Sequence, residues 1–259
     1  MGNRAEHGTA SWRAGDAYAY LHQVERRMFA WEWLRRTPGY RTAWIATREI
    51  DPVAQEAIAR SFGLAALIDP ARDSAIARPI WLEGRDRRVV AARITTEAAP
   101  ADRLDVRQFG AGAAAMELGS TGVEHWRLGG AGASVRLDVS GGTLLGAPSP
   151  LAYDVAGLAR AKPKLDALGT LLRLVASPQG EGRAGQVRLR VNRWVLELRT
   201  ADALAAGAIQ RAMAHAFFGI STTQWRKSEE SYRLRVQRLV RSARARLADP
   251  LDPSWFSSD

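Results

Sequence analysis

Arginine is concentrated in residues 183–247, and its chemistry is the clearest functional signal in the chain. This stretch holds 14 of the 37 lysine and arginine residues but only four of the 27 acidic residues. It therefore carries the whole formal net charge of +10, and the rest of the chain is neutral. The planar guanidinium group pairs in a bidentate manner with phosphate oxygens and guanine edges. A polyanion, and nucleic acid before others, is the partner that this composition favours.

The end of this stretch has the spacing of a long amphipathic helix. At 100° per residue, its apolar side chains fall within about 60° of one direction. These side chains are Tyr232, Val236, Leu239, Val240, Ala243 and Leu247. The arginines spread over the opposite face are Arg235, Arg238, Arg241 and Arg244. Ser228 can cap the helix, with Glu229 and Glu230 in its first turn, where the helix dipole favours acids.

Two shorter apolar stripes precede the long helix. One includes Trp194 and Ala205 and ends at Gly207, and the other runs from Ile209 to Phe217 and ends at Gly219. Two short helices joined by glycine turns and followed by a long basic helix are typical of a helix-turn-helix. We therefore predict such a unit over about residues 193–247, with its long helix in a DNA major groove about 12 Å wide.

Position along the long helix predicts which side chains read bases and which hold phosphates. The residues that open the helix would face base edges, and these are Lys227, Ser228, Ser231, Arg233 and Arg235. Those further along would contact phosphates without reading sequence, and these are Arg238, Arg241 and Arg244. Arg226 completes the predicted DNA-binding set. Glu229 and Glu230 either cap the helix or accept from cytosine, and we favour capping.

The elements that must position this helix are of mixed type, so we predict an α+β fold. Apolar spacing and capping residues predict helices over residues 16–34, 40–47, 51–62, 151–160 and 164–175. Alternating β-branched runs predict strands over residues 80–83, 89–95, 123–128, 134–139 and 143–145. Glycine pairs separate the last three strands, which predicts a small antiparallel sheet in the middle of the chain.

These elements suggest a division of the chain into modules. We expect a helical N-terminal module at 1–85, a linker or irregular segment at 86–119, a DNA-binding domain at 120–250 with its strands within 123–146, and a tail at 251–259. Many of the nine tryptophans lie in the neutral N-terminal half, where they suit core and interface positions. We expect that half to support self-association into a homo-oligomer and contact with a regulatory protein partner.

Other chemistries have little support in the sequence. The chain has no cysteine, which excludes disulfides, thiolate catalysis and iron–sulfur clusters. Its four histidines are scattered, and residues 110–115 imitate a dinucleotide-binding turn without the strand and acidic residue that such a site needs. We expect no catalytic residue, no metal site and no cofactor. No signal peptide or long apolar run is readable, which predicts a soluble, cytoplasmic and nucleoid-associated chain without membrane contact.

Several segments of the chain carry a resemblance to a known family. In the basic stretch they are Leu196 to Ala208, Ala216 to Gly219, Trp225 to Ser228 and Tyr232 to Arg241, with Val135 to Val139 and Gly142 to Gly146 upstream. In these segments the chain resembles the RovC-like DNA-binding domain of proteobacterial transcription factors. The runs Tyr18 to Leu21 and Phe29 to Arg36 resemble the transcriptional-regulator-like domain that often precedes it. The chain departs from the family's pattern at residues 209–214 and 249–252.

The resemblance implies a bacterial transcription regulator that self-associates. Together with the arginine pattern, it predicts a sequence-specific, double-stranded-DNA-binding regulator, with activation as its expected effect. Two copies would read an inverted or direct repeat with half-sites about 34 Å apart. The alternative from another class is a non-enzymatic adaptor or oligomeric scaffold whose basic helix docks an acidic partner. RNA binding is less favoured, because the sequence has no pattern of aromatic residues on strands.

Overall fold

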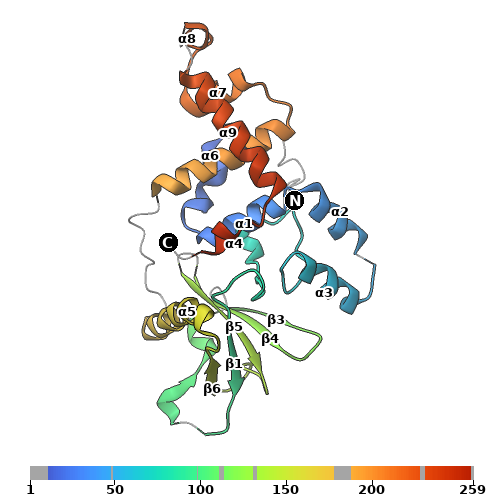
Figure 1. Ribbon diagram of the computed structural model, residues 1–259, viewed down its shortest axis with the longest axis vertical. Helices are drawn as coiled ribbons and strands as arrows, with labels where there is room; N and C mark the ends of the chain where they lie inside the picture. Colours follow the sequence, from blue (N-terminus) through green and yellow to red (C-terminus); the bar gives the residue numbers. More distant parts are fainter. Residues whose placement is uncertain are drawn as a thin grey trace.

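The computed structural model describes residues 11–47, 49–97, 99–110, 114–130, 133–177, 188–227 and 231–257. It confirms the predicted α+β class, with one sheet and many helices. The sheet and a single covering helix form one end of the molecule, and the remaining helices form the other (Figure 1). The basic C-terminal helices are farthest from the sheet.

The sheet has six strands in the order β2-β6-β1-β5-β4-β3. The strands are β1 (Val90–Ile94), β2 (Arg103–Leu104), β3 (Ala114–Leu118), β4 (Glu124–Gly129), β5 (Ser134–Ser140) and β6 (Ser149–Asp154). Helix α5 (Leu158–Ala176) packs on one face of this sheet. Leu171 and Leu174 of α5 share a core with Leu137 and Val139 of β5. Strands β1, β4 and β5 lie where the sequence predicts strands.

Several predictions about the sheet are wrong in detail. Segment 86–119 is not a linker, because it supplies β1, β2 and β3. The sheet is larger than expected and mixed, since β1 pairs with β5 in parallel. Parallel neighbours need a long crossover rather than a hairpin turn, so the glycine pairs gave no signal for this pairing. Residues 149–154 form β6, not the start of a helix, because pairing with β1 and β2 fixes them as a strand, while residues 143–145 are not a strand.

The N-terminal helices form the middle of the molecule. They are preceded by a 3₁₀ helix, η1 (Ser11–Arg13), and comprise η2 (Gly15–His22), α1 (Arg26–Leu34), α2 (Pro38–Ala46), α3 (Pro52–Ser61) and α4 (Ser74–Ala77). The predicted single helix over 16–34 is divided between η2 and α1, because the backbone at Glu25 is extended (φ −66°, ψ 154°). Asp51 caps α3 as predicted, with a proline in the first turn.

The C-terminal helices share a hydrophobic core with the N-terminal ones. The C-terminal elements are α6 (Arg188–Ala205), α7 (Gln210–Phe218), α8 (Thr222–Lys227), α9 (Ser231–Ala248) and η5 (Pro253–Phe256). Phe29 of α1, Leu198 of α6 and Trp255 of η5 belong to one buried cluster. The rings of Phe29 and Trp255 stack with centroids 5.8 Å apart. Residues 251–256, which we expected to be a tail, therefore complete the core of the N-terminal helices.

Two buried arginines connect the sheet to the rest of the fold. Arg27 of α1 donates to Asp86 at 2.6 Å and to the carbonyl oxygen of Ser134 in β5 at 2.6 Å. Arg136 of β5 donates to the carbonyl oxygen of Trp81 at 3.0 Å and to Asp138 at 3.1 Å. Both arginines are buried. Because both guanidinium groups lie inside the fold, their charges do not contribute to a positive surface that could attract an anion.

Candidate nucleic-acid interface

Helix α9 has the buried face that its apolar spacing predicts. Val236 and Ala243 are fully buried, and Leu239 and Val240 are nearly so. Val236 and Val240 pack in a cluster with Met213 of α7, whereas Ala243 packs in the core that includes the N-terminal helices. Burial of these side chains fixes α9 along its length and determines which face it presents to solvent.

The outward face of α9 carries arginines. The exposed ones are Arg233, Arg235, Arg238, Arg241 and Arg244. None of these five forms a salt bridge with any residue in the part of the chain that the structure describes. Arg246 differs, because it lies 3.9 Å from Asp252 and 4.3 Å above the ring of Trp255. Five exposed guanidinium groups of one helix are thus free of salt bridges to acidic partners among the described residues.

Aromatic rings beneath the first turns of α9 hold two of these arginines. The Arg235 guanidinium lies 4.3 Å from the centre of the Phe218 ring, at the end of α7. The Arg233 guanidinium lies 5.5 Å from the centre of the Trp225 ring in α8. Stacking on an aromatic face restricts the guanidinium without neutralising it. Sequence reasoning missed α8 and both contacts, because a six-residue helix is too short to show a period.

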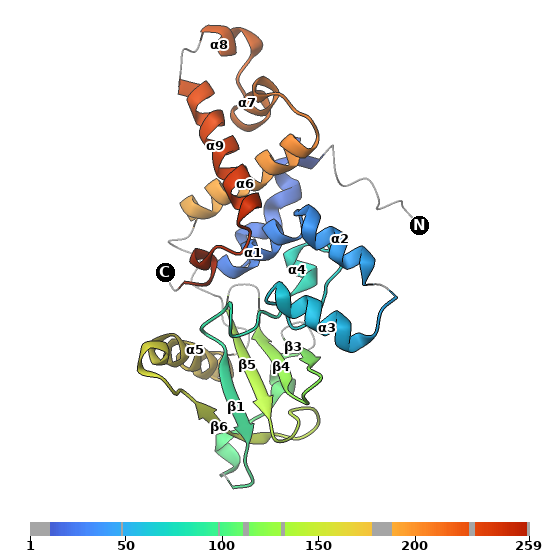
Figure 2. The same cartoon turned by 45° about the vertical axis from the view of Figure 1, so that its right-hand side comes forward.

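The surroundings of the arginine face are also basic. Helices α7, α8 and α9 contain nine lysine and arginine residues and no aspartate or glutamate. The two acidic residues of α6 are paired with other arginines. Glu197 is buried and lies 3.1 Å from Arg193, and Asp202 binds Arg36 at 2.8 Å. Figures 1 and 2 place α7, α8 and the first turns of α9 at the tip of the molecule. A positive field at an accessible tip is suited to a large anionic partner.

One arginine of the basic stretch has a structural role instead. Arg199 of α6 is buried and donates to the carbonyl oxygens of Trp12 and Arg13, each at 2.9 Å. Its guanidinium also lies 4.8 Å from the centre of the Phe217 ring. It therefore ties the first described residues to α6 and α7. The charge count in the sequence could not separate this arginine from those on the surface.

A buried polar cluster fixes α6 to the N-terminal helices. Arg36 makes a bidentate pair with Asp202 at 2.8 and 2.9 Å, and the hydroxyl of Tyr18 donates to the same carboxylate at 2.6 Å. Burial tends to raise the pKa of Asp202, but Arg36 and Tyr18 hold this pKa below its ordinary value. Arg36 also donates to the fully buried Glu32 at 2.7 Å. The cluster fixes the position of α6 relative to α1, and α9 packs on α6.

The predicted DNA-binding residues fall into three groups. The structure places Arg233, Arg235, Arg238, Arg241 and Arg244 at exposed positions of α9. Arg226 and Lys227 end α8, and Ser231 begins α9; for these three the structure describes the backbone position alone. Ser228, with Glu229 and Glu230, lies outside the described residues. The capping role predicted for Ser228 stays a prediction.

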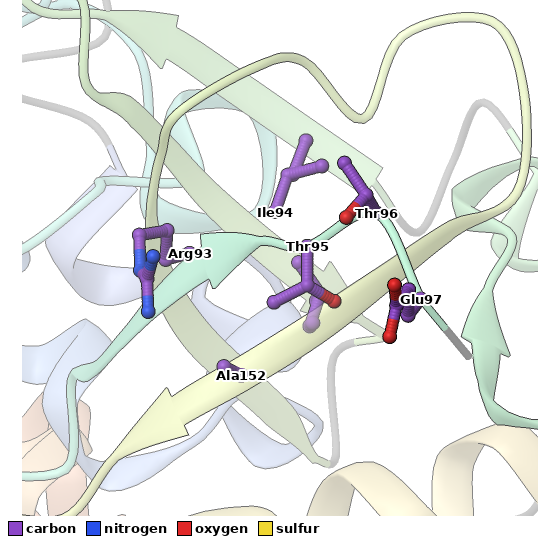
Figure 3. Close-up of a pocket in the computed structure, with 7 residues that line it drawn as sticks. Arg93, Ile94, Thr95, Thr96, Glu97 and Ala152 are labelled. Carbon is purple, nitrogen blue, oxygen red and sulfur yellow. The ribbon is translucent and has the colours of Figure 1, made fainter.

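A hollow that could hold a small molecule lies in the sheet, at the far end from α9. It measures about 600 Å³ and is lined by Arg93, Ile94, Thr95, Thr96, Glu97, Leu151 and Ala152 (Figure 3). All of these residues are exposed or half-buried, and small-molecule sites enclose most of their ligand. Among the described residues, no cluster of acidic and histidine side chains could hold a metal ion, and none of the described helices is long and apolar enough to cross a bilayer.

Comparison with known proteins identifies the N-terminal part of the chain. A family model for a proteobacterial transcriptional regulator-like domain matches residues 11–65. No curated protein matches the chain. The matched residues run from η1 to just beyond α3 and include Tyr18 and Arg36, which bind Asp202 of α6. The match confirms the resemblance of this N-terminal part and indicates a role in regulating transcription, and it ends before the sheet and the basic helices.

Proposed function

We propose that the protein is a sequence-specific, double-stranded-DNA-binding transcription regulator that inserts α9 into the major groove. The observation that carries the proposal is the set of five exposed arginines on α9, a helix that contains no acidic residue. In this proposal α7 and α9 are the two helices of a helix-turn-helix, with the short α8 between them. The regulator-like domain at residues 11–65 supports the regulatory role. We propose that the protein activates transcription.

The five arginines would divide two tasks between them. An 18-residue helix is about 27 Å long, so its two ends meet different parts of a duplex. Arg233 and Arg235, at the tip of the molecule, would contact guanine edges, where a bidentate pair is worth about 1–3 kcal/mol of discrimination. Arg238, Arg241 and Arg244 would lie along phosphates and position the helix. Proteobacterial promoter DNA is the proposed target class, read by a homo-oligomer.

Selection from a random-sequence duplex pool, followed by titration at near-physiological salt, tests the proposal. We expect the selected duplex to bind at least about 10³-fold more tightly than unrelated competitor DNA. Equal binding to both would refute sequence-specific recognition. Binding to an acidic protein in the absence of any duplex binding would favour the adaptor function instead.

Replacing Arg233 with alanine is expected to cost about 1–3 kcal/mol on the selected duplex and much less on unrelated DNA. The reason is that a base contact discriminates, whereas a phosphate contact does not. Fluorescence anisotropy on both duplexes measures the difference. Arg72→Ala, which removes an exposed arginine outside the basic helices, is the matched control and should leave both affinities unchanged. Equal losses on both duplexes in Arg233→Ala would contradict a base-reading role.

A further inference from the structure

The outer face of α5 exposes a line of leucines. Leu158, Leu165 and Leu172 are 95%, 56% and 71% exposed. They are spaced seven residues apart, which is nearly two helical turns, so they lie one above the other. The opposite face of α5 is already buried against the sheet through Leu171 and Leu174. A surface helix normally presents polar side chains outward, so a row of exposed leucines indicates an interaction surface.

The two flanks of this row differ in chemistry. At 100° per residue, Lys162, Asp166 and Arg173 lie on one side of the leucines. Ala161, Leu168 and Val175 lie on the other side. Lys162 and Asp166 pair within the helix at 3.2 Å, at an exposed position. The face therefore has an apolar centre, one charged edge and one apolar edge.

This pattern is complementary to itself in one orientation. A two-fold axis perpendicular to α5 near Gly169 would bring like edges together, so that the charged edge meets the charged edge of a second copy. Asp166 would then face Arg173 of that copy, and the same pair would occur twice. Leu165 and Leu172 would interleave with their counterparts, and Gly169 carries no side chain at the crossing. A parallel pair would instead press the charged edge against the apolar one.

We propose that α5 is a self-association surface that packs antiparallel against α5 of a second copy of this chain. Helix α5 lies beside the sheet and α9 lies at the other end of the molecule, as both views agree (Figures 1 and 2). The contact leaves the arginine face of α9 uncovered in both copies. It does not depend on DNA binding and can be tested without DNA.

The first test compares the full-length chain with Leu165→Glu and Leu172→Glu combined, by sedimentation equilibrium. We expect a dimer whose dissociation constant rises at least about 30-fold in the variant, with an unchanged circular dichroism spectrum because both side chains are already exposed. Leu145→Glu is the matched control, since Leu145 is also 56% exposed and lies outside α5. A monomeric wild-type chain at 100 μM, or an equally stable dimer in the variant, would overturn the proposal.

A charge-reversal cycle tests the antiparallel arrangement. Asp166→Arg and Arg173→Asp should each weaken the dimer about 5- to 20-fold, because each places like charges opposite each other. The two changes together should restore affinity to within about 3-fold of wild type. Absence of restoration would rule out the antiparallel pairing. A monomeric leucine variant that still binds a single DNA half-site would leave the proposed function intact.

Discussion

Replacing Arg238, Arg241 and Arg244 together with alanine is expected to weaken binding to every duplex by roughly 100-fold at near-physiological salt. Each phosphate that an arginine neutralises releases a counterion and contributes about −0.9 to the slope of log K against log salt. The three changes should therefore lower the magnitude of that slope by about three. The three side chains are exposed, so the fold should be retained. Anisotropy titrations between 50 and 300 mM salt would measure both quantities.

A second triple variant separates local contact from net charge. Arg72, Arg87 and Arg103 are also exposed but lie outside the basic helices. Replacing all three with alanine removes the same net charge and should change affinity less than about 5-fold. Equal losses in the two triple variants would mean that DNA responds to total charge alone, and the assignment of phosphate contacts to α9 would be wrong.

Asp202→Ala should lower the free energy of unfolding by about 2–3 kcal/mol, since it leaves the Arg36 guanidinium without half of its partners. The side chain of Asp202 is 21% exposed, so the loss is smaller than for a fully buried pair. The hydroxyl of Tyr18 also loses its acceptor. Urea unfolding followed by tryptophan fluorescence gives this difference directly.

The control for Asp202→Ala is an ion pair on the surface. Arg107→Ala removes the exposed pair between Arg107 and Asp105 and should leave the free energy of unfolding nearly unchanged. A loss as small as this in Asp202→Ala would show that the Arg36–Asp202 contact contributes little to holding α6 against the N-terminal helices. A reduced affinity for DNA in Asp202→Ala would link that contact to the position of α9.

Acid should destabilise the protein through Glu32 of the same cluster. Burial alone would raise the pKa of Glu32, but Arg35 and Arg36 lower it from 4.5 to about 2. Because the folded-state pKa is the lower one, the stabilisation is present above pH 4.5 and is lost as the pH falls toward 2. Urea midpoints measured between pH 6 and pH 2 should decline over this window. Glu32→Gln should be less stable at pH 6 and show a shallower decline.

The sequence was most informative where a structure depends on neighbours along the chain. The stripe from Tyr232 to Leu247 predicted α9 and its buried face, because a helix repeats its environment every few residues. The arginines between those positions had to lie outward once the apolar side was buried. The same local logic predicted α3 from Asp51, which caps it.

The sequence was least informative where distant segments determine the structure. Strand β6 contains no β-branched residue, and it is held by pairing with β1, which lies about 60 residues earlier. Strand β2 has only two residues, and β3 is short and begins with two alanines, so neither shows a clear alternation. The Arg36–Asp202 pair joins residues 166 positions apart, and no local pattern predicts such a contact. Likewise, charge counting could not distinguish Arg199 from the surface arginines, although it is buried and donates to the carbonyl oxygens of Trp12 and Arg13.

The stacking of Trp255 on Phe29 has a consequence for how the protein is made. Residue 255 is translated 226 positions after residue 29, which takes a ribosome roughly 10–45 s at 5–20 residues per second. During that interval the apolar side chains of α1 lack part of their packing, although the regulator-like domain has already left the ribosome. The N-terminal domain cannot complete its folding until α9 and η5 have been synthesised. Nascent chains that stop before residue 251 therefore expose the aromatic core to chaperones and proteases. Every chain whose N-terminal domain has completed its folding has also synthesised the arginine-bearing helix α9.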